Sequence, residues 1–249
     1  MKIGIIGAGN IGGALAKKLS ALGHSVAIAN SRGPETLTDL AAKVGARAVT
    51  VHEAVKDVEI VVVTIPQKNV PQLPQGLFRE VSESVVIVDT GNYYPTIRDG
   101  VIADIESGMP ESVWVAKQLE RPVFKIFNNI MTESLVDGAR PAGAKDRIAL
   151  PIAGDDAGGK RVLLELVDTL GFDAVDAGRL EESWRQQPGT PVYCTDLDAE
   201  GVRRALASAD RSKSSERRDL SLAKLSELPP GSTAKDIVAF AREIQHAPK

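Results

Sequence analysis

The N-terminal segment combines a short apolar run with three glycines at a fixed spacing. Residues Lys2–Ile6 are mostly apolar, and GAGNIG follows at once, so that Gly7, Gly9 and Gly12 form the pattern G-x-G-x-x-G. After a strand, the first glycine permits a sharp turn, the second leaves room for a pyrophosphate, and the third lets a helix lie close to the sheet. The pattern therefore predicts a dinucleotide-binding unit of the Rossmann type.

The residues that follow the glycines fit this interpretation. An apolar stripe at helical spacing comes next, and Gly23 supplies a helix stop signal. The stripe consists of Ile11, Leu15, Leu19 and Leu22. The run Ser25–Ala29 then predicts the second strand. The helix between the two strands would turn its free N–H groups and its positive dipole end toward the phosphates of a bound dinucleotide.

The second predicted strand ends in Asn30-Ser31-Arg32-Gly33. Enzymes that use NAD place an Asp or Glu about 20 residues after the first glycine, where it binds the ribose 2′-hydroxyl. No acidic residue stands in this turn. Arg32 can pair with a phosphate and stack on adenine, and Ser31 can donate a hydroxyl hydrogen bond. We therefore expect the cofactor to be NADP(H).

Composition excludes several classes of protein. The chain has 249 residues and a formal net charge of −3, so no basic surface is expected for nucleic acid or an anionic membrane. The single cysteine, Cys194, excludes an internal disulfide and a cysteine-rich metal site, and we interpret it as an inert thiol. The first predicted strand begins at residue 2, and no apolar run reaches membrane-spanning length, so we expect a cytoplasmic protein that binds no metal.

Three further apolar runs predict the rest of the sheet. They are Val58–Val63, Ser84–Asp89 and Val123–Phe127. Such continuous runs are typical of parallel strands that are buried on both faces. We therefore expect an α/β fold with a doubly wound parallel Rossmann sheet, a small C-terminal α/β extension and a helical tail.

Ligands of such a sheet bind at the carboxyl ends of the strands. The residues found there are mostly amides, hydroxyls and aromatic rings. They are Thr64, Ile65, Pro66, Asn92, Tyr93, Tyr94, Asn128 and Asn129. We expect the nicotinamide ring between Thr64–Pro66 and Asn92, facing Asn128 and Asn129.

The remaining sequence divides into two parts. A loop rich in Gly, Ala and Pro separates the predicted NADP-binding domain, 1–145, from a small α/β unit, 146–197, which would close the pocket. Within that unit we expect strands at Arg147–Ala153 and Phe172–Val175, with a helix at Asp156–Leu170 between them.

Residues 198–249 read as a charged linker and a helical tail. The stretch Arg211–Arg218 is polar and predicts a linker, with two helical pieces after it. The last helix opens at Ser232-Thr233, and Ile237, Phe240 and Ile244 recur on one face. Because that stripe needs a covering surface, we expect a homodimer with these helices at the interface, although the stripe could also dock on its own subunit.

The side chains that commonly move a hydroxyl proton are scarce. The histidines are His24, His52 and His246, and none follows a predicted strand at the cofactor end. The amide-rich pocket instead suits direct hydride transfer to an acceptor that already stabilises the added charge, such as a flavin or deazaflavin.

Several segments together resemble the coenzyme F₄₂₀-dependent NADP reductase family. They are GAGNIGGALAKKLSALGH, ANSRG, TIP at 64–66, GNYYP at 91–95, KIFNNI at 125–130, LPIAGDD at 150–156 and VDAGRL at 175–180. The resemblance implies hydride transfer between NADP(H) and the deazaflavin F₄₂₀. The amide-rich pocket leaves a flavin open as an alternative partner. This chain departs from the characterised reductases of that family at the segments NNI and NYYP, and its tail lies outside the resemblance.

The resemblance also implies roles for individual residues. It assigns NADP contacts to Gly9, Asn10, Ile11, Ser31, Arg32, Ile65 and Pro66. The deazaflavin ring would stack at 128–130. Together with the strand-end argument, the predicted cofactor-binding residues are Gly7, Gly9, Asn10, Ile11, Gly12, Asn30, Ser31, Arg32, Thr64, Ile65, Pro66 and Asn92. The predicted catalytic residues are Asn128, Asn129 and Tyr94.

Two other functions remain open at this point. The same scaffold could reduce an imine or a ketone, with Tyr94 as a proton donor near the nicotinamide. It could also be a non-catalytic NADP(H) sensor whose tail helices carry the signal to a partner.

Overall fold

A computed structural model describes residues 1–245 and contains a six-stranded sheet in the order β3-β2-β1-β4-β5-β6. Its strands are β1 (Lys2–Ile6), β2 (Ser25–Ala29), β3 (Arg47–Ala48), β4 (Ile60–Val63), β5 (Val86–Asp89) and β6 (Phe124–Lys125). All neighbouring strands pair in parallel. This is the strand order of a Rossmann fold, so the predicted fold class is confirmed. The order reverses between β1 and β4, where such sheets bind their ligands.

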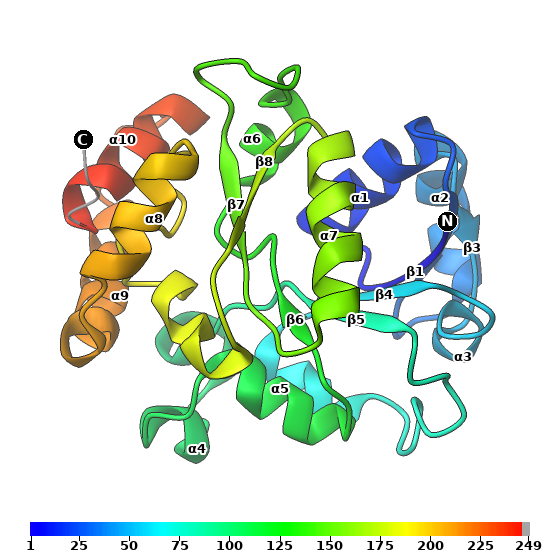
Figure 1. Ribbon diagram of the computed structural model, residues 1–249. Helices are drawn as coiled ribbons and strands as arrows, with labels where there is room; N and C mark the ends of the chain where they lie inside the picture. The colour runs from blue at the N-terminus through cyan, green and yellow to red at the C-terminus, as the bar shows by residue number, and fades with distance from the viewer. Residues whose placement is uncertain (246–249) are drawn as a thin grey trace.

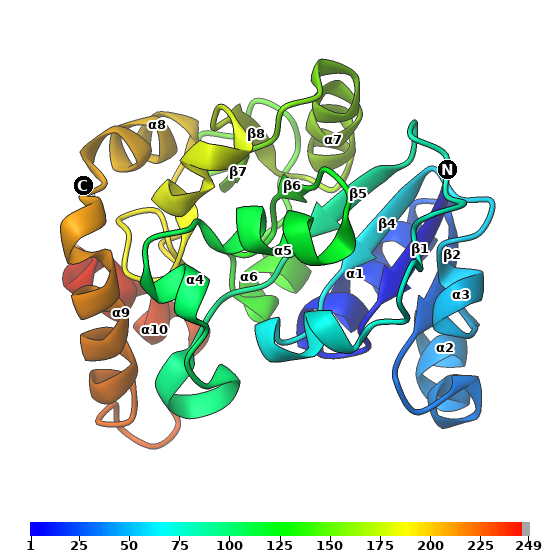
Figure 2. The same ribbon diagram turned by 90° about the horizontal axis from the view of Figure 1, so that it is seen from below.

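Helices cover both faces of the sheet (Figure 2). The helices on the first face are α1 (Asn10–Ala21), α2 (Thr38–Val44) and α7 (Ala157–Thr169), and those on the second are α3 (Val51–Ala54) and α5 (Glu111–Leu119). Neighbouring residues of one strand serve opposite faces: Val62 packs in the first apolar cluster and Val61 in the second. This double burial explains why the strands read as unbroken apolar runs.

The small α/β unit forms a second, two-stranded parallel sheet. Its strands are β7 (Ala149–Ile152) and β8 (Asp173–Asp176), joined by α7 as expected. They run side by side through the middle of the molecule (Figure 1). An antiparallel bridge between Lys125 and Ala153 ties this sheet to β6. Leu163 of α7 and Leu15 of α1 share one apolar cluster, so the core continues across the predicted boundary at 145/146.

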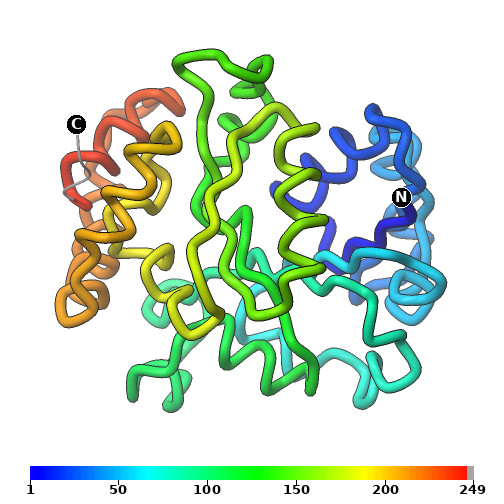
Figure 3. Tube along the Cα trace, in the orientation of Figure 1, coloured from blue at the N-terminus to red at the C-terminus, as the bar shows by residue number. Residues whose placement is uncertain are grey.

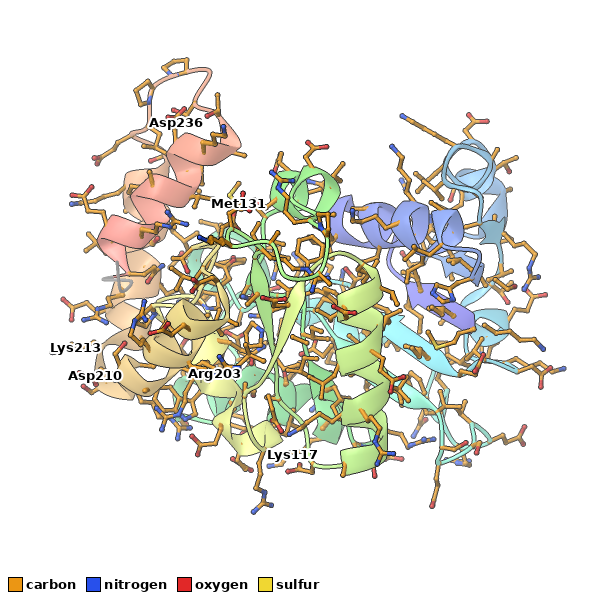
Figure 4. The ribbon with its side chains drawn as sticks, turned by 45° about the horizontal axis from the view of Figure 1, so that its top comes forward. Lys117, Met131, Arg203, Asp210, Lys213 and Asp236 are labelled. Atoms are coloured by element: carbon orange, nitrogen blue, oxygen red, sulfur yellow. The ribbon has the colours of Figure 1, made fainter. Side chains whose placement is uncertain are left out.

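The tail differs from its prediction. It contains α8 (Ala199–Ser208), α9 (Arg211–Leu225) and α10 (Ala234–Ile244), so the predicted linker at Arg211–Arg218 is wrong and is the first half of a helix. Asp210 caps that helix by accepting from the Ser212 amide, and it pairs with Lys213 at 3.4 Å (Figure 4). The last helix begins at its N-cap Thr233, as expected, with a capping box formed by Thr233 and Asp236.

Several short elements complete the chain, and the tube in Figure 3 shows how they join the larger ones. They are the helices α4 (Ala103–Glu106) and α6 (Thr132–Asp137), the 3-10 helices η1 (Pro34–Leu37), η2 (Gln67–Gln72) and η4 (Leu180–Gln186), and the π-helical turn η3 (Pro95–Asp99). Within residues 1–245, no helix has both the length and the apolar composition needed to span a membrane.

Candidate active site

The glycine turn has the geometry that a pyrophosphate needs. Gly7 has φ +122°, a conformation that side-chain-bearing residues rarely adopt. A Cβ atom on Gly12 would lie 2.0 Å from the Gly7 carbonyl oxygen, so a larger residue cannot fit between helix and strand. A Cβ atom on Gly9 would meet nothing within 4 Å. Gly9 is also the N-cap of α1 and supplies no side-chain cap, which leaves the first N–H groups of the helix for an anion.

The turn after β2 presents Ser31 and Arg32 to solvent. The Asn30 side chain shapes it: Oδ1 accepts from the Arg32 amide at 2.9 Å, and Nδ2 donates to Thr36 Oγ1 at 2.9 Å. Arg32 is exposed, so it is placed to meet a phosphate. Sequence reasoning missed Glu35, which packs against Gly33. The Glu35 Oε1 atom lies 2.4 Å from the position that a Cβ atom on Gly33 would take.

The segment after β4 lies directly against the glycine turn. The Thr64 amide donates to the Ile6 carbonyl at 2.8 Å. A Cβ on Gly7 would lie 2.1 Å from the Thr64 carbonyl oxygen and 3.0 Å from the Ile65 Cγ2 atom. Thr64 and Ile65 therefore adjoin the end of β1 and the glycine turn, at the switch point of the sheet.

Asn92 and Asn128 are joined by a reciprocal pair of hydrogen bonds. Asn92 Nδ2 donates to the Asn128 carbonyl at 2.9 Å, and Asn128 Nδ2 donates to Asn92 Oδ1 at 3.1 Å. Gln186, in η4, completes the group: its Nε2 donates to Asn128 Oδ1 at 3.0 Å, and its carbonyl accepts from Asn128 Nδ2 at 2.6 Å. Asn128 is only 3% exposed, so its side chain is committed to holding the two loops together. No pattern in the sequence pointed to Gln186.

Asn129 lies beside this network and is also buried. Its carbonyl accepts from the Cys194 amide at 2.9 Å, which anchors the segment that follows η4. Its side-chain Oδ1 has no hydrogen-bond partner among the described residues. Asn129 is not among the residues that line the cavity beside Asn92.

A buried ionic cluster supports the loop that begins at Gly91. The Lys125 ammonium, 0% exposed, lies 3.3 Å from Asp89 Oδ2 and 3.5 Å from Glu111 Oε2, and it also donates to the Gly91 carbonyl. Asp89 accepts from the Gly91 amide at 2.8 Å and from Ser112 Oγ at 2.6 Å. Sequence reasoning missed this cluster, although a lysine inside the apolar run VFKIF was a usable signal.

Glu111 should make stability depend on pH. Burial raises its pKa from about 4.5 to about 7, with Lys125 acting in the opposite direction. A raised carboxyl pKa stabilises the fold at low pH, and that stabilisation is lost as pH rises toward 7. We expect the free energy of unfolding of wild type, relative to Glu111→Gln, to fall by roughly 3 kcal/mol between about pH 5 and about pH 8. Urea unfolding of both proteins across this pH range measures the difference. The same pH dependence of the unfolding free energy in wild type and Glu111→Gln would contradict the prediction.

Tyr94 and Tyr193 meet through their hydroxyl groups, which form a short hydrogen bond. Burial raises the pKa of both phenols and raises the pKa of Cys194, their neighbour, to about 12, which agrees with an inert thiol. The Arg98 guanidinium lies 5.0 Å from the centre of the Tyr94 ring. Of these, sequence reasoning found Tyr94 and missed Tyr193.

A cavity of about 400 Å³ connects the glycine turn with the tyrosine pair. Its lining includes Asn10, Ile11, Thr90, Asn92 and Asn128, together with Tyr94, Tyr193 and Cys194. Of the predicted site residues, Asn10, Ile11, Asn92, Tyr94 and Asn128 line this cavity, whereas Arg32, Thr64 to Pro66 and Asn129 do not.

The tail supplies the remaining wall of this cavity. Leu222 and Leu225 of α9 and Ile237 and Phe240 of α10 line it. Met131, another lining residue, lies beside α10 (Figure 4). The predicted apolar stripe therefore packs, at least through Ile237 and Phe240, on its own chain. Arg218, in the segment predicted as a linker, reaches back to Glu106 at 3.7 Å and stacks on Tyr93.

The other candidate groups lie elsewhere. His24 Nδ1 contacts the N-terminal amine at 3.1 Å, His52 is exposed on α3, and His246 lies outside the described residues. Within residues 1–245, no three His, Cys, Asp or Glu residues are grouped to hold a metal ion. A larger cavity of about 1020 Å³ lies at the amino ends of β5 and β6, on the edge opposite the glycine turn, where such sheets do not bind their cofactors.

The fold and the glycine turn define a dinucleotide-binding oxidoreductase scaffold. The chain belongs to the family described as NADP oxidoreductase, coenzyme F₄₂₀-dependent, whose model matches residues 2–93. That match covers the glycine turn, the Asn30–Gly33 turn and the segment after β4.

The chain is also similar to individual proteins. The Escherichia coli K12 protein YjhV is 39% identical over 111 residues, which are 44% of this chain and 81% of YjhV. A solved protein of Sinorhizobium meliloti, SMa0349, is 28% identical with a TM-score of 0.67 and covers 79% of this chain and 95% of its own. A candidate F₄₂₀-dependent NADP reductase from Arthrobacter sp. FB24 shares the fold at 22% identity, with a TM-score of 0.60, over 74% of this chain and 87% of its own.

Proposed function

We propose that the protein oxidises NADPH by passing hydride to a small-molecule acceptor bound in the cavity between the glycine turn and the tail helices. The observation that carries the proposal is that Asn10 and Ile11, beside the phosphate turn, line the same cavity as Asn92 and Tyr94. A cofactor that crosses the switch point from Arg32 to Thr90 would bring its reactive ring into this space.

The residues present fit the cofactor. The open space at Gly9 and the uncapped start of α1 would receive the pyrophosphate, and Ser31 with Arg32 would receive the 2′-phosphate. Thr64, Ile65 and Pro66 would border the nicotinamide half. When bound, NADPH supplies the hydride, and the protein aligns and shields the reacting atoms.

Two classes of acceptor are candidates. Family membership supports a deazaflavin such as F₄₂₀, or a flavin, as a second cofactor or substrate. The paired hydroxyls of Tyr94 and Tyr193 in the cavity favour, as a second candidate, a ketone or an imine that needs a proton as well as a hydride.

Arg32 should determine the preference between dinucleotides. We expect NADPH to bind at least about tenfold more tightly than NADH, and Arg32→Ala to remove about 1.5–3 kcal/mol of 2′-phosphate binding. Binding of NADH should change little, because NADH lacks that phosphate. Calorimetry with both dinucleotides measures this, with Arg79→Ala as a control on a distant surface. Equal affinity of the wild type for NADPH and NADH would refute the assignment.

The tail stays a predicted dimer interface. Because Ile237 and Phe240 of α10 face the cavity of their own chain, the dimer proposal depends on α9, where Leu220 and Leu225 are 43% and 42% exposed. These apolar side chains support the homodimer as a proposal. Light scattering on the full-length protein should give twice the mass of one chain. A monomer at micromolar concentration would contradict it.

Parallel assays decide the function. NADPH oxidation is followed with F₄₂₀, FAD, FMN, a quinone, a ketone and an imine as acceptors. We expect turnover with at least one of them. Binding of NADPH without any turnover, together with a rearrangement of the tail on binding, would favour the non-catalytic sensor. A cytoplasmic location and the absence of a nucleic-acid partner stay predictions.

A further inference from the structure

The tyrosine pair stands where a proton is needed. Tyr94 comes from the loop after β5 and Tyr193 from the segment after η4, and their hydroxyl groups meet in the cavity that Asn10 and Ile11 also line. Both tyrosines are half-buried, and their hydroxyl groups have few protein partners: each other, and the Cys194 thiol beside Tyr193. The pair is therefore available to a ligand from the cavity side.

The backbone holds both rings in place. The Tyr94 amide donates to Asp99 Oδ2 at 2.8 Å, and the Tyr193 amide donates to the Thr190 carbonyl at 3.0 Å. Cys194, next in the chain, has φ +56° and donates its amide to Asn129. Two elements far apart in sequence are thus fixed so that one hydroxyl always faces the other.

The other titratable groups that line the cavity are poorly suited to donate a proton. Arg218 is engaged by Asp219 at 2.8 Å and is a permanent cation. The Cys194 thiol is hydrogen bonded to Tyr193 and is a weak hydrogen-bond donor. Glu133 is exposed to solvent at the first turn of α6. Neither described histidine lines the cavity.

We propose that Tyr94 and Tyr193 act together as the proton donor to a carbonyl acceptor, a ketone or an aldehyde, held in this cavity. The inference rests on the proposed function. As hydride reaches the carbonyl carbon, the π electron pair moves to oxygen, and that oxygen takes the proton of one tyrosine. The O–H bonding pair remains on the phenolate, which then accepts a hydrogen bond from the other tyrosine. The Arg98 cation lies 5.0 Å from the centre of the Tyr94 ring. Water restores the proton, so carbonyl, NADPH and one solvent proton give alcohol and NADP⁺.

The chain contains three tyrosines, and the third is a matched control. The Tyr93 hydroxyl accepts from the Ile102 amide at 3.0 Å, and Tyr93 is not a lining residue of the cavity. Tyr93→Phe therefore removes a buried phenolic hydroxyl without touching the proposed proton path.

The test compares two acceptors of similar shape. β-Tetralone needs hydride and a proton, whereas the N-methyl-dihydroisoquinolinium ion needs hydride alone. We expect Tyr94→Phe and Tyr193→Phe each to lower kcat/KM for β-tetralone by about 100-fold or more, and for the iminium ion by less than about threefold. Tyr93→Phe should leave kcat/KM unchanged for both acceptors. Calorimetry should show unchanged NADPH binding in all three variants.

Each other outcome is decisive. Equal losses with both acceptors would mean that the tyrosines only maintain the cavity, and no loss with β-tetralone would remove them from the reaction; both results overturn the inference. Loss in Glu133→Gln with full activity in the tyrosine variants would transfer the role to Glu133. A wild type that reduces the iminium ion but never β-tetralone overturns the carbonyl assignment and leaves the proposed function standing. A wild type that oxidises NADPH with neither acceptor, nor with F₄₂₀ or flavins, overturns the proposed function itself.

Discussion

Gly9→Val is expected to abolish binding of both NADPH and NADH while the protein still folds. A Cβ on Gly9 would contact no protein atom within 4 Å, so a valine there fits the folded chain. The branched side chain would instead occupy the space that the pyrophosphate needs at the start of α1. We expect the dissociation constants measured by calorimetry to rise by about 100-fold or more, which corresponds to about 2.7 kcal/mol.

Two neighbouring glycines provide the controls. Gly13→Ala would place its Cβ 3.9 Å from the Leu40 Cδ1 atom, an ordinary contact, and should bind NADPH normally. Gly12→Val would force a side chain into the 2.0 Å space beside the Gly7 carbonyl and should destabilise the fold itself. A folded Gly9→Val protein that binds NADPH as wild type does would show that the dinucleotide lies elsewhere.

Asn128→Ala is expected to lower turnover by about 100-fold and to change NADPH affinity by less than about threefold. Asn128 is committed to Asn92 and Gln186, so its loss frees the loop that borders the acceptor but leaves the glycine turn intact. The unpaired amides left behind should also cost about 1–3 kcal/mol of stability. Turnover is therefore measured well below the melting temperature.

Two further variants separate positioning from unfolding. Gln186→Ala breaks the same network from the other side and should reproduce the loss of turnover. Gln72→Ala removes an exposed amide outside the network and should leave turnover unchanged. If Asn128→Ala instead weakened NADPH binding and kept its turnover, Asn128 would belong to the cofactor site.

Local sequence patterns were enough to predict the sheet and the glycine turn. Both depend on short-range features, because apolar runs buried on two faces and glycines at fixed spacing are legible without knowledge of contacts. Strand lengths were less accessible. The run Val123–Phe127 predicts five strand residues, but β6 ends at Lys125, because Phe127 takes φ +63° to turn the chain into the site.

The tail shows why polar composition misleads. Arg211–Arg218 reads as a linker because it is highly charged, but Asp210 caps its first turn and Arg218 is 7% exposed against Tyr93 and Glu106. The cap is a local signal, but the burial of Arg218 depends on three-dimensional packing, which charge patterning does not reveal. The same holds for Gln186 and Tyr193, whose partners lie 58 and 99 residues away in the chain.

Transfer of deuterium from NADPH to the acceptor tests the central claim most directly. NADPH labelled with deuterium on the transferred position of the nicotinamide ring is incubated with the full-length protein and each acceptor that supports NADPH oxidation. The reduced product is then analysed by mass spectrometry. Direct hydride transfer within the cavity predicts one deuterium in each molecule of product, whatever the exchange with water. Oxidation of the labelled NADPH with no deuterium in the product would contradict the account.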